Sequence, residues 1–509
     1  MPAWPVAVFG LAVLLAAAYL ISPLPLGFPG QWTYGRAPTS RWAGVPVPAA
    51  LLALTLLLIS LRHGAPSSRL VAACWVVGLA VLCIALSVVA QACLSDFGLG
   101  GAAFVSRLYN NDGVYYMEAR RITSPVAYVA GFAERLDERP SGKVFRVETH
   151  PPGFTVEFYL IRRAYMDSPW FKGLLQSVSS VGASSEPLRA RESDEPNARA
   201  VACGVTLLHV VAAATGVILA YLLARQFLAR EEAIACAACF SLSPGVLAFF
   251  GESSQLLIPL GGAVVLCSVT AIERGSVVSG ILAAAFLSAG LFFSAAFLAL
   301  GFFCVLYATL RLIQLRREAP SPLGRLRWLA AGASCLTFAA AHLLLWGVFR
   351  YDAATVILKC LANNELFYTQ YQRTRAVWAV LTPLELGMSL GAGLAALILA
   401  TAINWLLRSL ASRRLESVRP LALALAATLV ALVLSGSVRG ETARNLLLFA
   451  PAATVVAWVG LLDTWTVSRR FHLVVIISQG VLALLTLATT DPMFVASTLR
   501  GIVNGTVPF

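Results

Sequence analysis

The chain has 509 residues, of which 59% are hydrophobic and only 12% are charged, and its formal net charge is +13. Soluble domains carry roughly 25% charged residues, so a soluble enzyme, a coiled coil, a collagen and a disordered regulator are excluded. We therefore expect a polytopic membrane protein, whose apolar segments approach the ~20 residues that one bilayer crossing needs.

The basic excess lies outside the longest polar segment. Residues 97–198 carry twelve basic and twelve acidic side chains, so the whole net charge comes from the rest of the chain. Many of the other arginines occupy short turns between apolar segments, a pattern typical of topology determinants and of contact with anionic lipids rather than nucleic acid. The ten cysteines lie almost all in apolar segments, so no disulfide framework is indicated.

Thirteen apolar segments predict an all-α polytopic fold with about 13 transmembrane helices and a large exoplasmic loop carrying amphipathic helices. The predicted spans are approximately residues 4–23, 44–61, 70–94, 200–224, 233–250, 256–272, 276–291, 293–313, 328–349, 384–407, 420–436, 446–462 and 473–489. One apolar stretch, 276–313, is too long for a single helix across ~30 Å of hydrocarbon. We divide it near Ser288.

The arginine-rich turns predict the orientation. They follow the second, fourth, eighth, tenth and twelfth spans and so share one side, which the positive-inside rule assigns to the cytoplasm. The N-terminus is then cytoplasmic and the C-terminus exoplasmic. The segments expected outside are 97–198, 350–383 and 437–445. The predicted divisions are two extra N-terminal spans at 1–69, a transmembrane core at 70–490 and an exoplasmic tail at 491–509.

Asp112 is the first candidate functional residue of the exoplasmic loop. It precedes a short helical pattern in which Tyr115 and Ala119 share one side and Glu118 the other, as in a helix lying flat on a membrane. Asp112 then has two interpretations. It is an N-cap of that helix, or it is a general base at the water–lipid boundary, where partial desolvation raises its basicity.

His150 is the second candidate. Pro151 and Pro152 follow it and exclude a regular helix at that point, so His150 is expected on a rigid corner. A lone histidine is most often a hydrogen-bonding side chain. No HxxxH or HExxH pattern accompanies it, so the histidines predict no metal site.

Taken together, these residues resemble the GT-C superfamily of integral-membrane glycosyltransferases, which includes protein O-mannosyltransferases and the bacterial lipid A aminoarabinose transferase. The resemblance covers roughly residues 70–490. It is carried by Asp112 with Tyr115, Tyr116 and Ala119, by His150-Pro151-Pro152, by the glycine- and serine-broken pair of spans at 280–297, and by the segment 439–451. The chain departs from the pattern at Asn111, where a second acid is often found, at Gln255, where an Asp is expected, and at 361–365, which lacks a His.

The resemblance implies a transferase that takes its sugar from a polyprenyl-phosphate-linked donor and passes it to an exoplasmic glycan, lipid or protein. Asp112 would deprotonate the acceptor hydroxyl. A guanidinium binds phosphate oxygens with two hydrogen bonds. The expected substrate-binding residues are Arg444 first, then Arg439, Arg373 and Arg375, together with His150, Tyr115, Tyr116 and Glu118.

We expect arginine rather than a divalent cation on the lipid phosphate, because the outer segments contain no paired carboxylates such as DxD. Arg439 and Arg444 could converge on one anion, with Glu441 orienting one of them. The alternative functions are a transporter or flippase of lipid-linked sugars and a non-catalytic scaffold with the same fold. We expect a bacterial inner-membrane protein that contacts membrane lipids and no nucleic acid.

Overall fold

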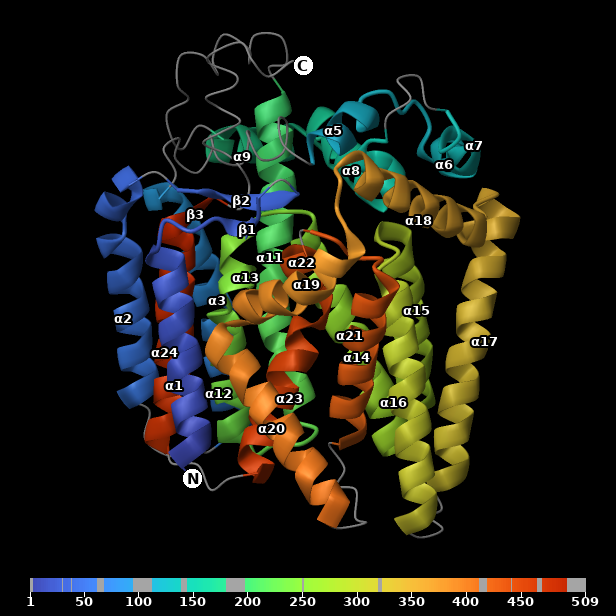
Figure 1. Ribbon diagram of the computed structural model, residues 1–509. Coiled ribbons are helices and arrows are strands. Elements are labelled where there is room, and N and C mark those ends of the chain that lie inside the picture. Colours follow the sequence, from blue (N-terminus) through green and yellow to red (C-terminus); the bar gives the residue numbers. More distant parts are fainter. Residues whose placement is uncertain are drawn as a thin grey trace.

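A computed structural model describes residues 3–29, 31–37, 39–61, 68–94, 112–138, 144–179, 197–249, 251–318, 323–411, 419–440, 442–464 and 469–491. Its long apolar helices stand side by side as a bundle (Figure 1). They are α1 (Ala3–Ile21), α2 (Pro46–Leu61), α3 (Arg69–Leu94), α11 (Ala198–Ala224), α12 (Arg230–Ser241), α14 (Ser254–Arg274), α15 (Val277–Phe293), α16 (Phe297–Glu318), α17 (Leu323–Phe349), α20 (Ala392–Ala411), α21 (Arg419–Ser435), α23 (Ala450–Thr464) and α24 (Arg469–Thr489).

The all-α polytopic fold is confirmed. Within the described residues, eight helices are long and apolar enough to cross a membrane, and a ninth results if the bent pair α19–α20 is one span. Three further apolar helices, α2, α15 and α21, are shorter. The predicted number of thirteen spans is therefore not established, although each predicted segment coincides with a helix or with a broken pair of helices.

Two predicted spans are broken helices. In the segment 233–250, α12 ends at Ser241 and α13 (Pro244–Ala248) begins anew, because proline lacks the N–H that would continue the first helix. In the segment 384–407, α19 (Arg375–Leu390) and α20 meet at an angle of 116°. Gly391 allows this bend with a φ of +101°, and a Cβ there would lie 1.7 Å from Oε1 of Gln479.

The predicted break near Ser288 is wrong in position. Helix α15 continues to Phe293, and α16 begins at Phe297. Ser294 is extended at this point, and its hydroxyl accepts a hydrogen bond from the amide of Ala296 at 3.2 Å. The serine hydroxyl thus satisfies an amide just before the start of α16, as a capping side chain does.

Short helices cover the end of the bundle opposite the N-terminus (Figure 1). We call them the outer cover: α5 (Gly113–Ala119), α6 (Pro125–Ala130), α7 (Phe132–Arg135), η2 (Arg146–Thr149), α8 (Gly153–Asp167), α9 (Pro169–Ser179) and α18 (Ala353–Gln370). Helix α8 packs on α5, α9 and α11, and α18 packs on η2. The described helices of two of the segments predicted to be exoplasmic, 97–198 and 350–383, therefore meet at one end of the molecule.

A small antiparallel sheet, absent from the sequence prediction, joins the two ends of the described chain. It consists of β1 (Leu26–Phe28), β2 (Trp32–Arg36) and β3 (Thr490–Asp491), with Gly35 opposite Asp491. After β2 the chain forms η1 (Thr39–Gly44), from which Arg41 pairs with Asp491 at 3.6 Å. Helix α1 packs on α20 and α24, so the first spans lie directly against the predicted core.

Candidate active site

Asp112 does not cap its helix. It occupies the N-cap position of α5, but its side chain makes no capping hydrogen bond. Its carboxylate instead accepts two bonds from Ser253, at 3.2 Å from the amide and 3.0 Å from the hydroxyl. The side chain is 1% exposed. The N-cap interpretation is therefore wrong: Asp112 turns into the protein, toward the start of α14.

Asp112 belongs to a buried charge cluster with Arg146, Glu252 and Arg444. Nη1 of Arg146 lies 3.8 Å from Oδ1 of Asp112 and 3.8 Å from Oε1 of Glu252. The same Glu252 oxygen contacts Nη1 of Arg444. All four side chains are at most 9% exposed. Two carboxylates and two guanidiniums sum to zero charge, which is what makes their joint burial tolerable.

A tight turn between α13 and α14 presents Glu252 and Ser253 to the cluster. Gly251 has a φ of +66°, and a Cβ there would lie 2.4 Å from Cγ2 of Thr206. Gln255 closes the turn, because Oε1 accepts from the Gly251 amide at 2.7 Å and Nε2 donates to the Val246 carbonyl at 2.6 Å. An aspartate could not donate the second bond, so the Gln255 departure from the GT-C pattern has a structural role here.

His209 braces the same turn from α11. Its Nδ1 lies 2.9 Å from the Gly251 carbonyl, and its Nε2 lies 2.6 Å from Oε1 of Glu157 in α8. A carbonyl only accepts, so Nδ1 carries a proton. His209 is fully buried in this position.

His150 lies beside the cluster through Arg146. Its Nδ1 is 3.1 Å from the Arg146 carbonyl, so Nδ1 donates and Nε2 is free to accept. Burial, with the nearby charges of Arg146 and Arg444, lowers the pKa of His150 to about 3, although its hydrogen bond to the Arg146 carbonyl acts in the opposite direction. The imidazole is therefore neutral at physiological pH.

The three other predicted residues of α5 form packing contacts. Tyr115 is fully buried against His150 and Phe154, and Tyr116 packs on Phe158. Glu118 is 5% exposed and pairs with Arg135 at 2.5 Å. Burial raises the pKa of the Glu118 carboxyl, against the lowering effect of Arg135 and Arg121. The expected surface helix is therefore wrong, because α5 buries both its tyrosine side and its glutamate side.

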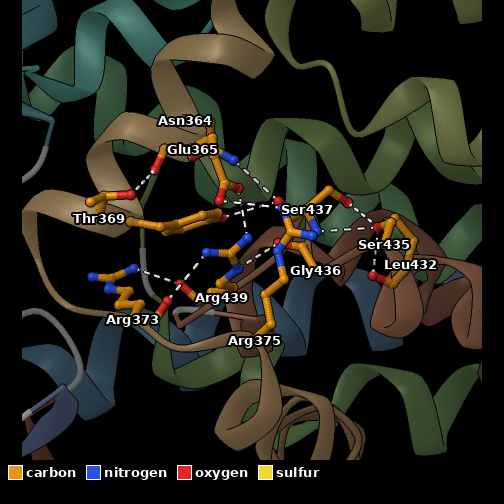
Figure 2. Close-up of polar contacts among 11 residues, drawn as sticks. Asn364, Glu365, Thr369, Arg373, Arg375, Leu432, Ser435, Gly436, Ser437 and Arg439 are labelled. Atoms are coloured by element: carbon orange, nitrogen blue, oxygen red, sulfur yellow. Dashed lines mark hydrogen bonds and ion pairs between the residues drawn. The ribbon is translucent and has the colours of Figure 1, made fainter.

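The other predicted arginines form a separate group, the arginine cluster, with Glu365 (Figure 2). Arg439 pairs with Glu365 at 2.6 Å and Arg375 with the same carboxylate at 3.3 Å. Arg373 donates to the Arg439 carbonyl at 2.7 Å, and Arg439 donates to the Arg373 carbonyl at 3.2 Å. Burial raises the pKa of Glu365, but the hydrogen bond and charge of Arg439, with Arg375, bring it below its ordinary value.

Arg439 and Arg444 thus have different carboxylate partners, Glu365 and Glu252. Glu441, which was expected to orient one of them, lies outside the described residues. The pair of guanidiniums that does share a partner is Arg146 and Arg444. Arg146 and Glu252 were missed from the sequence. The signal available was their charge close to the two motifs, four residues before His150 and three before Gln255.

Among the described residues, no three His, Cys, Asp or Glu side chains gather as a metal site would require. Asp112 and Glu252 both face Arg146, so a guanidinium occupies the position between the two nearest carboxylates.

No family model matches the chain, and a search of curated proteins gave no significant match. Solved structures of an oligosaccharyltransferase from Archaeoglobus fulgidus do match. The apo form is 11% identical, and the match covers 82% of this chain and 56% of the archaeal chain, with a TM-score of 0.43. The form with Zn and sulfate is 13% identical, and the match covers 77% of this chain and 53% of the archaeal chain, with a TM-score of 0.41. The complex of this enzyme, AglB, with an inhibitory peptide and a dolichol-phosphate is 12% identical. That match covers 82% of this chain and 56% of the archaeal chain, with a TM-score of 0.39.

The chain spans little more than half the length of those solved structures.

Proposed function

We propose that the chain is a GT-C-like membrane glycosyltransferase that transfers a sugar from a polyprenyl-phosphate donor to an acceptor hydroxyl. The observation that carries the proposal is the buried charge cluster, in which two carboxylates and two guanidiniums lie next to one another at the covered end of the bundle. Such a transfer needs a base for the acceptor proton and positive charge for the departing phosphate.

Asp112 is the proposed base. Ser253 donates one hydrogen bond to each oxygen of its carboxylate, so both oxygens act as acceptors. Burial removes competing water from the same carboxylate. A hydroxyl of the sugar acceptor that approaches Asp112 would meet a carboxylate that can take its proton. The hydrogen bonds from Ser253 hold that carboxylate in place.

Arg146 and Arg444 are the proposed phosphate ligands. Both contact one oxygen of Glu252, so two guanidiniums already converge on a single anionic atom. A phosphate oxygen has the same charge preference and suits the planar guanidinium fork better than a lysine would. Nε of Arg146 has no hydrogen-bond partner among the described residues, which leaves a buried donor for an incoming anion.

The proposed step is a single displacement. The acceptor oxygen gives its proton to Asp112 and forms a bond to the anomeric carbon, while the bond from that carbon to the phosphate oxygen breaks. The electron pair leaves with the polyprenyl phosphate, which Arg146 and Arg444 stabilise. One displacement inverts the anomeric configuration. The arginine cluster offers three guanidiniums against one carboxylate at the same end and would attract the anionic donor.

Mass spectrometry of cell-envelope glycans tests the proposal in a strain lacking the gene. Restoring the wild-type gene should add one sugar to a defined glycan, lipid or protein. Asp112→Asn, at equal expression, should not restore it, because removing a general base costs ~10²–10⁴-fold in rate. The matched control is Asp167→Asn, which makes the same change in an exposed pair with Arg163 at 2.5 Å on α8.

Two results would count against the proposal. Full restoration by Asp112→Asn would leave a scaffold or a different base. A flippase would be favoured if the strain lacking the gene accumulated a lipid-linked sugar on the cytoplasmic side. The purified protein would then form no transferase product.

A further inference from the structure

A groove of about 1150 Å³ lies at the end of the bundle away from the outer cover, between α16 and α17. Leu312, Leu315 and Arg316 line it from α16, and Trp328, Gly332 and Leu336 line it from α17. Its walls are largely apolar. Figure 1 places this end of the two helices opposite α5 and α8.

The groove lies between two helices that both contact α14 and α15 but have different main neighbours. Helix α17 packs chiefly on α15, where Gly280 lies so close that a Cβ would be 2.3 Å from the Ala330 carbonyl, whereas α16 packs chiefly on α21. The face of α17 toward α16 is left open: no heavy atom lies within 4 Å of the Cβ positions of Gly324 and Gly332.

Exposed apolar side chains are ordinary on a membrane helix, so the walls alone indicate nothing specific. The distinguishing feature is positive charge at one end of the groove. The Arg316 guanidinium lies 5.1 Å from the ring centre of Trp328, and Arg325, also on the lining, is exposed. Among the described residues, no carboxylate is recorded against either arginine.

The neighbouring arginines differ from Arg316 and Arg325 because they already bind groups of the protein. Arg327 donates to the carbonyls of Ile272 and Glu273 at 3.0 and 3.3 Å, and Arg311 pairs with the Glu273 carboxylate at 2.8 Å. Arg316 and Arg325 are therefore the two cations of the lining available to an external anion. An apolar groove that ends in two free guanidiniums matches an amphipathic molecule with an anionic head.

We propose that this groove binds an anionic phospholipid, with its phosphate against Arg316 and Arg325 and an acyl chain along Gly332 and Leu336. Basic pockets between transmembrane helices on the cytoplasmic side are suited to anionic head groups. The distribution of arginine predicts that this end is cytoplasmic. The inference does not depend on the proposed transferase activity, because the groove lies at the opposite end from the charge cluster.

The test measures lipid retained by the purified full-length protein in nanodiscs, with phosphatidylglycerol and phosphatidylcholine competing. Wild type should prefer phosphatidylglycerol. Each of Arg316→Gln and Arg325→Gln should lower that preference about fivefold, the effect of one basic residue near an anionic surface. Gly332→Trp should abolish retention by filling the groove, because a Cβ at this position meets no atom of the surrounding protein within 4 Å.

Gly347→Trp is the matched control, because Gly347 is on the same helix, also has open space around it, and lies outside the groove lining. It should retain the lipid as wild type does. Equal loss in both tryptophan variants, or equal binding of the two lipids by wild type, would mean ordinary surrounding lipid and would overturn the proposal. Displacement of phosphatidylglycerol from the groove by a polyprenyl phosphate at equal concentration would also overturn it, in favour of the donor lipid.

Discussion

The charge cluster predicts a measurable coupling between Glu252 and Arg444. Its four charges sum to zero, so Glu252→Gln leaves an excess of one positive charge and Arg444→Gln an excess of one negative charge. Arg146 lies 3.8 Å from each carboxylate, where two unit charges interact by ~4 kcal/mol at an effective dielectric constant of ~20. Leaving one member of a buried pair unpartnered costs ~3–5 kcal/mol, so we expect each single variant to lose that much stability.

The double variant restores neutrality and should be at least ~2 kcal/mol less destabilised than the sum of the single changes, within the range measured for groups in contact. Titration of the purified proteins with a denaturing detergent in mixed micelles gives the unfolding free energies. The exposed pair Arg163–Asp167 provides the control cycle, for which we expect a coupling of only ~0.3–0.5 kcal/mol. Additive losses in the Glu252–Arg444 cycle would refute the idea that these charges compensate one another.

Three further predictions follow from individual residues. Gly251→Ala should destabilise the protein by ~2–4 kcal/mol, from its φ of +66° and the clash with Thr206; an unchanged melting temperature would contradict the turn geometry. His150 has a folded pKa of about 3, below the unfolded ~6.5, so its contribution to stability is present above pH 6.5 and is lost as pH falls toward 3. Wild type should therefore lose more thermal stability between pH 7 and pH 5 than His150→Asn does, and equal losses would contradict the burial of a neutral imidazole. Arg439→Lys should lose ~2 kcal/mol of local stability by giving up charged hydrogen bonds of the guanidinium fork, seen as faster amide exchange at 436–440; unchanged exchange there would contradict it.

Much of the fold could be predicted because the length of an apolar segment is a local property of the chain. The breaks within predicted spans were harder to predict. Pro244 marks one plainly, whereas the bend at Gly391 depends on Gln479, 88 residues later, which fills the space that a side chain would need. The sheet formed with Thr490 and Asp491 is also non-local and gives no periodic signal over two residues.

In the candidate site, Asp112, His150 and Arg444 were singled out from the sequence, and the structure connects them through Arg146 and Glu252. No pattern identified Arg146, because an arginine in a polar loop looks like any solvated charge until its burial is known. Glu118 was misplaced for the same reason. Its charge suggested that it lies on an exposed side of α5, but its ion pair with Arg135 allows it to be buried.

The most direct test is turnover of a polyprenyl-phosphate sugar by the purified protein in excess chelator, followed by the release of polyprenyl phosphate. Wild type and Asp167→Asn should turn over equally, Asp112→Asn should fall by at least ~10²-fold, and Arg444→Lys should lose most of the activity because a point charge cannot replace the planar fork. Activity abolished by the chelator and restored by Mg²⁺ or Mn²⁺ would contradict phosphate binding by arginine alone. Turnover by Asp112→Asn at the wild-type rate would contradict the central claim that Asp112 is the base.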